Sequence, residues 1–246
     1  MKLNKRAACL SLVMTGVLSA CGGGGSSTPA ATPVAGPGSA AEGFYEANGG
    51  GFSLLFLDDG SYWAFSKFGV MRGTGTSING SFSSSNARDF TATPPTEAPL
   101  TATFTAAPAI SSGRLTFGGQ IVNYTATPQV DYIYNKAALL SAVAGNWTTN
   151  NFDSDGNPRA SAPIIISGAG AWISSDASGC QLSWQLTPRA SGKNVYSLLA
   201  TAGAAPCTSP GATLGGVLVV DTPSKNLIIL LVTNDNSAAG LFAGAR

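Results

Sequence analysis

The sequence predicts an all-β protein, an antiparallel meander that forms one or two small β-barrel or sandwich lobes with one short helical segment between them. From Gly43 onward, short runs of β-branched and aromatic residues alternate with clusters of Gly, Asp, Asn and Pro. Apolar residues make up 44% of the 246 residues, which is enough to bury a core in one domain or two small ones. Only Lys136–Ala144 has a helical composition, and Gly145 follows it.

A β-hairpin is expected near the start of the folded body. Phe52–Leu57 and Tyr62–Phe65 are apolar runs that flank Asp58-Asp59-Gly60, and Asp-Gly between two such runs is a strong hairpin signal. We interpret the two aspartates as turn residues rather than as a catalytic pair.

The second run of this hairpin is aromatic on both faces. In an extended strand Trp63 and Phe65 share one face and Tyr62 lies on the other. We expect a buried core on one face and an interface on the other. The alternative is that these rings, with Phe68 beside Lys67, form a surface for a sugar or an aromatic ligand.

The second half of the body predicts eight strands, of which Gln181–Thr187 is the clearest because Leu182, Trp184 and Leu186 alternate with polar residues. Eight antiparallel strands can close into a small barrel that is filled by side chains or holds one ligand. We therefore expect an N-terminal β lobe over 43–135 and a C-terminal lobe over 136–246, although one continuous sheet remains open. The strands are expected near 145–149, 163–167, 171–175, 179–187, 194–201, 212–220, 226–233 and 239–243.

The first twenty residues have the order of a secretory signal peptide. Lys2, Lys5 and Arg6 precede an apolar run that is too short to span a membrane, and small residues end that run. The segment Leu18-Ser19-Ala20-Cys21 resembles the lipobox of bacterial lipoproteins. That resemblance implies cleavage before Cys21 and acylation of Cys21, which would anchor the protein in a membrane. The alternative is an ordinary secreted protein cut near Ala20.

Residues 21–42 are expected to tether the body to this anchor. The segment is rich in Gly, Ser, Pro and Ala, and Val34 is its single large apolar side chain. Gly22 stands at the position after the cysteine, where lipoproteins that are retained in the inner membrane carry an aspartate. The resemblance therefore implies an outer-membrane location in a bacterial cell envelope. Whether the body faces the periplasm or the exterior stays open.

Two cysteines remain after the signal and the lipid anchor are assigned. Cys180 and Cys207 would lie in an oxidising compartment, which predicts a disulfide in the C-terminal lobe. A catalytic or metal-binding thiol pair is the alternative, and the absence of both a CxxC spacing and any histidine disfavours it.

Catalytic motifs are absent from the sequence. The chain has no histidine, no nucleophile elbow and no phosphate-binding glycine loop, because Asn194 follows Gly192-Lys193 where that loop needs Ser or Thr. We therefore expect no catalysis and no cofactor. With 13 basic and 12 acidic residues and no basic block, we also expect no nucleic-acid partner.

One loop has a weak metal-binding pattern. Asp153, Asp155 and Asn157 place oxygen ligands at alternate positions, as calcium loops do. Gly156 stands fourth rather than sixth and Ile164 occupies the twelfth position, so a solvated loop is the preferred interpretation.

Both expected lobes begin with a glycine-aromatic motif, Gly43-Phe44-Tyr45 and Gly145-Asn146-Trp147. The second motif resembles the first strand of lipocalin-like barrels. Two small barrels on a lipid tether resemble a lobe of transferrin-binding-protein-like surface lipoproteins. No binding residue is carried over from either family, and Trp147 is expected to fill the barrel interior.

The sequence thus favours a lipid-anchored envelope protein that acts as a binding or scaffold module, with an apolar pocket at a barrel mouth or an exposed apolar patch. One alternative is an inhibitor of an envelope-targeting hydrolase, which would present a loop such as Gly203–Pro210. A second alternative is a carboxylate-dependent hydrolase with two of the twelve acids in a cleft.

Overall fold

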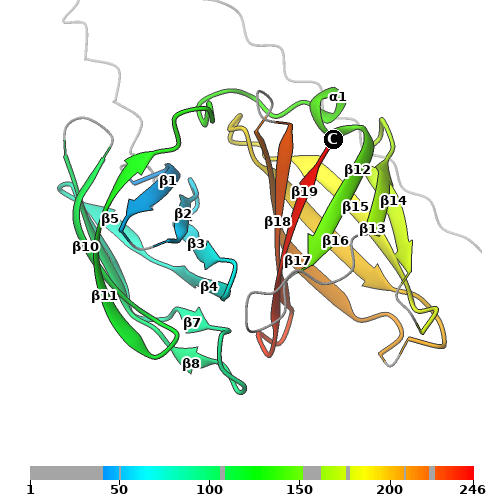
Figure 1. Cartoon of the computed structure of the whole chain (residues 1–246), viewed down its shortest axis with the longest axis horizontal. Helices are drawn as coiled ribbons and strands as arrows, with labels where there is room; N and C mark the ends of the chain where they lie inside the picture. The colour runs from blue at the N-terminus through cyan, green and yellow to red at the C-terminus, as the bar shows by residue number, and fades with distance from the viewer. Residues whose placement is uncertain are drawn as a thin grey trace, which may run out of the picture. The chain divides into compact units, whose positions relative to one another are not determined.

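The computed structural model describes residues 41–49, 51–105, 109–151, 162–175, 178–207, 209–221 and 225–246. All of these residues belong to one compact unit. They form two antiparallel sheets and one helix of four residues, so the all-β prediction is confirmed. Figure 1 shows the two sheets and their strands.

The first sheet has eleven strands and curves into a half-barrel. Its order is β5-β6-β9-β10-β11-β1-β2-β3-β4-β7-β8, so β5 and β8 are its two edges. The strands are β1 Gly43–Asn48, β2 Ser53–Phe56, β3 Ser61–Ser66, β4 Gly69–Thr74, β5 Thr76–Ile78, β6 Ser81–Ser84, β7 Arg88–Asp89, β8 Thr96–Glu97, β9 Leu100–Phe104, β10 Ile110–Phe117 and β11 Gln120–Pro128.

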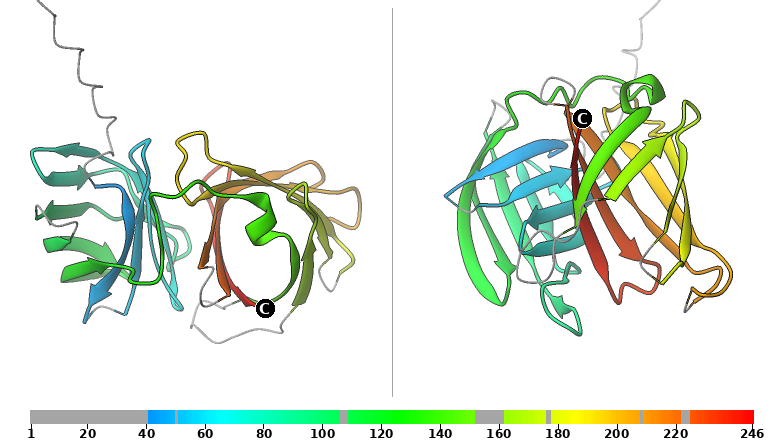
Figure 2. Two further views of the ribbon diagram at one scale, coloured as in Figure 1. Left: turned by 90° about the horizontal axis from the view of Figure 1, so that it is seen from above. Right: turned by 45° about the vertical axis from the view of Figure 1, so that its right-hand side comes forward.

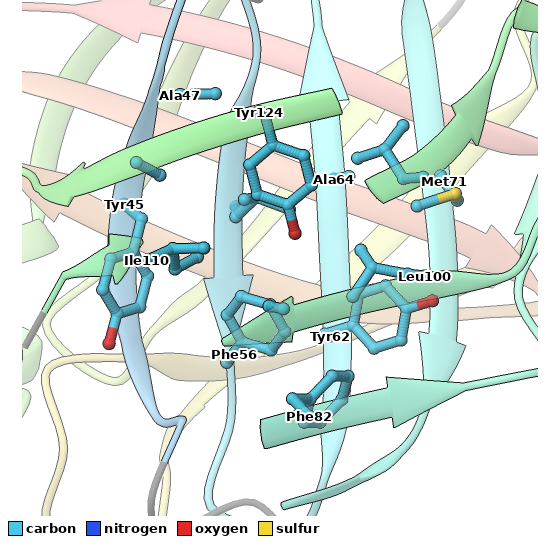
Figure 3. Close-up of a cluster of buried hydrophobic side chains, with 14 of the residues drawn as sticks. Tyr45, Ala47, Phe56, Tyr62, Ala64, Met71, Phe82, Leu100, Ile110 and Tyr124 are labelled. Carbon is cyan, nitrogen blue, oxygen red and sulfur yellow. The ribbon is translucent and has the colours of Figure 1, made fainter. Parts of the chain in front are cut away.

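Aromatic rings fill the concave side of the half-barrel (Figure 3). Phe56 lies at the centre of this cluster, with Phe82 and Tyr62 at centroid distances of 4.8 and 5.6 Å. All three side chains are almost completely buried. Edge-to-face contacts between such rings stabilise a core beyond the area that they bury.

The expected hairpin is present as β2 and β3. Gly60 adopts the left-handed conformation (φ 82°) that the turn requires. Asp59 closes the turn, because its Oδ1 accepts hydrogen bonds from the Ser61 amide (2.9 Å) and hydroxyl (2.6 Å). The prediction that the aspartates serve as turn residues is therefore confirmed for Asp59.

The second sheet has eight strands and curls into a nearly closed barrel. Its order is β13-β12-β19-β18-β17-β16-β15-β14, and all eight expected strands are present within a few residues of their predicted ends. Seen from above, the strands form an almost complete ring (Figure 2, left). They are β12 Gly145–Asn151, β13 Ala162–Ile166, β14 Ala171–Ser175, β15 Gln181–Pro188, β16 Tyr196–Ala202, β17 Thr213–Asp221, β18 Asn226–Thr233 and β19 Ala239–Ala245.

The helix is shorter than the sequence predicted. α1 spans Leu140–Val143, whereas a helix was expected over Lys136–Ala144. Leu139 has extended backbone (φ −123°, ψ 127°), so the helix begins only at Leu140. The Ala138 amide just before it donates to the carbonyl oxygen of Lys193 (3.2 Å).

α1 covers the end of the barrel at which β12 begins. The Trp147 indole N–H donates to the Val143 carbonyl oxygen (2.7 Å), and both side chains are buried. The Arg246 guanidinium donates to the carbonyl oxygens of Ala142 and Ala144, at 2.9 and 2.8 Å. The expectation that Trp147 fills the barrel interior is confirmed, and α1 with Trp147 closes this end.

A third apolar cluster contains residues of both sheets. Trp63 and Phe65 of β3 belong to it with Val217 and Val219 of β17, while Tyr62 belongs to the half-barrel core. The prediction that β3 has a core face and an interface face is therefore confirmed.

Candidate ligand-binding site

A cavity of about 250 Å³ lies inside the barrel, toward the end opposite α1. Strands β12, β13, β14, β15, β18 and β19 all contribute to its wall. None of the side chains that line it carries a charge, so the cavity favours an uncharged occupant. The lining residues are Thr149, Ile164, Trp172, Ser174, Ser175, Cys180, Leu182, Trp184, Ile229 and Phe242.

Two stacked tryptophans form one wall of this cavity. Trp172 lies directly opposite Trp184 in the β14–β15 ladder, and their rings are parallel (5°) with centroids 5.0 Å apart. The Phe242 ring meets Trp184 edge-on at 6.4 Å. Strand pairing fixes this geometry, because side chains directly opposite each other share one face of the sheet. The wall therefore offers flat aromatic surface to an apolar or aromatic occupant.

The polar groups at the cavity are few. The Trp184 indole N–H donates to Ser174 Oγ (2.8 Å), which satisfies the indole and holds its orientation. Thr149 is 3% exposed and takes part in an interaction of its own. No residue of the lining titrates in the physiological range, so occupancy of the cavity should not depend on pH between 5 and 8.

The disulfide between Cys180 and Cys207 is present, as predicted. Cys180 lies on the wall of the cavity and immediately precedes β15. The bond attaches the 203–210 loop beside this wall, and Ala204, Ala205 and Pro206 in that loop are exposed. The disulfide thus fixes one border of the cavity.

A second cavity of about 220 Å³ is polar, and its lining comes from both sheets. Arg189 Nη2 donates to Asp58 Oδ1 (3.0 Å) and Asp59 Oδ2 (2.9 Å) across a large sequence separation. The Arg72 guanidinium lies over the Trp63 ring at 5.3 Å, and burial lowers its pKa although Asp59 opposes this. The charged residues that line this cavity are Arg72, Arg189 and Asp59, and Asp58 pairs with Arg189 beside it.

Asp59 is ionised in this arrangement. Partial burial raises its pKa, but the hydrogen bonds from Ser61 and Arg189 outweigh it, and the net pKa is lowered from 3.8. Arg189 in turn has a raised pKa: burial lowers it, but the bonds to Asp59 and Asp58 outweigh this. A general acid would need a raised carboxyl pKa, so the pair is better suited to joining the sheets than to catalysis.

Several residues singled out from the sequence lie outside the described residues: the signal 1–20, Cys21 and the loop with Asp153, Asp155 and Asn157. Among the described residues no group of three or more Cys, Asp or Glu side chains could hold a metal ion. Lys193 forms an ion pair with Glu42, its Nζ lying 2.7 Å from Oε1.

The sequence did not single out Trp172, Ser174 or Phe242 for binding. Alternation in β15 placed Trp184 on a buried face, but the partner of Trp184 depends on the β14–β15 register. The sequence offered one signal, namely that Trp172 is the second residue of β14 and that β14 shortly precedes the alternating strand β15. The ion pair between Arg189 and Asp58 had no sequence signal, because 131 residues separate the two.

Comparison of the chain with protein family models, curated proteins and solved structures finds no match. In the part of the chain that the structure describes, no helix is long and apolar enough to cross a membrane.

Proposed function

We propose that the protein is a lipid-anchored binding module of the cell envelope, and that its C-terminal barrel binds an uncharged apolar or aromatic group. The observation that carries this proposal is the apolar cavity with the Trp172–Trp184 stack. Protein pockets for small ligands are typically concave and apolar, with a few placed polar groups. Ser174 and Thr149 would be those groups here.

The size of the cavity sets the size of the occupant. An apolar cavity of about 150 Å³ accommodates benzene. A cavity of about 250 Å³ therefore suits one or two fused rings, or one large side chain. This is small for a lipid chain or a haem.

The test is calorimetric titration of the folded body with 2-naphthol, an uncharged two-ring probe. We expect saturable binding with one site per chain. The variant Leu182→Trp places an indole on the wall of the cavity and should weaken binding by about tenfold or more, because the indole takes up the space that the probe needs.

The matched control is Ile121→Trp, a substitution at an exposed position (60%) of the half-barrel. It should leave the 2-naphthol affinity unchanged. Absence of binding to the wild type, or equal binding to both variants, would contradict the proposal.

The lipid anchor is tested separately, by the intact mass of protein purified from membranes. We expect a mature chain that begins at Cys21 and carries acyl chains, and a Cys21→Ser variant that is no longer acylated. A soluble wild-type product without acyl chains would show that the protein is secreted rather than anchored.

A further inference from the structure

The barrel has a seam between β13 and β14. These strands follow one another through the turn at 167–170, but they stand at opposite ends of the sheet order and are not paired. The turn itself is closed, because the Ser167 amide donates to the Ala171 carbonyl oxygen (2.9 Å). Beyond the turn, each of the two has one edge that pairs with no other strand in the described part of the chain.

Hydrogen-bond alternation shows which backbone groups face the seam. The Leu186 amide donates to the Gly170 carbonyl oxygen (2.9 Å), so Gly170 and Leu186 face each other in a hydrogen-bonded pair. In an antiparallel ladder such pairs alternate, so Trp172 and Ser174 direct their N–H and C=O groups toward β15. Ile173 and Ser175 therefore direct theirs into the seam.

The two edges of the seam differ in their chemistry. Pro163 in β13 has no N–H group to donate, and proline is a common means of blocking an edge strand. β14 contains neither proline nor any charged residue, and Ile173 on its outer face is 66% exposed. β14 is thus an unprotected edge, which is the kind of edge that accepts another strand.

The cavity lies directly behind this edge. Ile164 of β13 and Trp172 and Ser174 of β14 line it, so its wall includes both borders of the seam. A strand added along β14 would direct alternate side chains inward, toward the cavity, and outward, beside Ile173. Outside the barrel, Ile165 on β13 is 68% exposed and Leu199 on β16 is 51% exposed.

We propose that β14 binds an extended, uncharged segment of another protein as an added strand, and that one apolar side chain of this segment occupies the barrel cavity. The inference rests on the proposed function, since it assigns the class of partner that fills the same cavity. Main-chain hydrogen bonds to Ile173 and Ser175 would supply affinity, and the cavity would select the side chain. The segment 21–40 of this chain fits this pattern poorly in composition, because it contains Pro29, Pro33 and Pro37 and no aromatic residue.

The probe is a set of capped, uncharged hexapeptides in which three alternate positions carry Phe, Trp, Leu, Ile or Val and the other three carry Thr or Ser. We expect members with a large apolar residue at an inward position to displace 2-naphthol from the wild type. In an added strand, alternate residues of the peptide direct their amides toward β14, and we call each alternating set of residues a register. N-methylation of the register that faces β14 should reduce affinity about tenfold or more, and N-methylation of the other register should not.

The matched protein variants are Ile173→Pro and Ile165→Pro, which each remove one amide that faces the seam, from β14 and β13 respectively. Ile173→Pro should weaken peptide binding about tenfold or more, whereas Ile165→Pro should change peptide binding little. The affinity for 2-naphthol should change little in either variant. If Ile173→Pro does not fold, the two registers of methylated peptide on the wild-type protein still decide the question.

The outcomes separate the two proposals. Binding of 2-naphthol without displacement by any peptide, or equal tolerance of methylation in both registers, would overturn strand addition and leave the binding function in place. Peptide binding in one register without 2-naphthol binding would support strand addition alone. A wild type that sediments as a dimer and becomes monomeric on Ile173→Lys would assign this edge to a second copy and overturn the proposal.

Discussion

The two sheets of this protein fill their concave sides differently. The half-barrel is packed with rings, and Phe56, Tyr62 and Phe82 are in mutual contact at its centre. The barrel is packed at the α1 end by Trp147 but leaves a cavity at the other end, where Trp172 and Trp184 line a wall. The half-barrel core is thus filled by its own side chains, whereas the nearly closed barrel retains unfilled space beside Trp172 and Trp184.

The largest expected effect compares one phenylalanine from each interior. Phe56→Ala in the half-barrel should lower the free energy of unfolding by about 3–5 kcal/mol, because the cavity it creates is enclosed by rigid rings. Phe242→Ala, at the wall of the existing cavity, should cost less than half as much. Urea denaturation measures both, and equal losses would show that the two interiors are equally well packed.

The second prediction concerns the disulfide, which belongs to the barrel alone. Replacing Cys180 and Cys207 by serine should lower the free energy of unfolding by about 3–4 kcal/mol, from the entropy of a loop with a sequence separation of 27. Chemical denaturation of the double variant tests this. A loss below about 1 kcal/mol would contradict the loop-entropy explanation.

The third prediction tests the ion pair between the sheets. Arg189→Met should lower the free energy of unfolding by about 1–3 kcal/mol, because the side chain is only 15% exposed and two carboxylates lose their partner. The control is Arg114→Met, on the exposed face of β10, which should change stability by less than about 0.5 kcal/mol. Equal effects would mean that the pair adds nothing to the contact between the sheets.

The smallest expected effect is a pH dependence of that ion pair. The pKa of Asp59 is lower in the folded protein than the value of about 3.9 expected for the unfolded chain. The ionised pair therefore stabilises the fold fully above about pH 4, and this stabilisation is lost as the pH falls through the folded pKa. Unfolding measured between pH 2 and 6 should show a smaller acid-side loss in Arg189→Met, and parallel curves would contradict the assignment.

Local patterns predicted more of the barrel than of the half-barrel. All eight barrel strands were expected from short apolar runs between turn residues, and most of them pair with a neighbour in sequence. The half-barrel depends on pairs between strands that are not consecutive, such as β6 with β9 and β1 with β11. The composition of a strand does not indicate which distant strand it pairs with. Its open edges therefore could not be predicted.

The candidate site was predictable in kind but not in composition. The sequence predicted a small barrel with either an apolar pocket at its mouth or an exposed apolar patch, and it placed Trp184 on a buried face. Stacking on Trp172 depends on one register, and a one-residue slip would place the two rings on opposite faces. The helix is shortened because the backbone at Leu139 is extended, although alanine and leucine dominate the segment's composition.

The ladder between β12 and β19 has a consequence for folding kinetics. It pairs Thr148 with Ala245, and the half-barrel is likewise joined where Tyr45 pairs with Pro128. Both joins bring together segments that are far apart in sequence, and their loop-closure entropy makes such contacts slow to form. Until β19 pairs with β12, the edges of β12 and β18 are free to associate with other chains. Each sheet is therefore protected from misassembly only when its last strand along the chain, β19 in the barrel and β11 in the half-barrel, has paired.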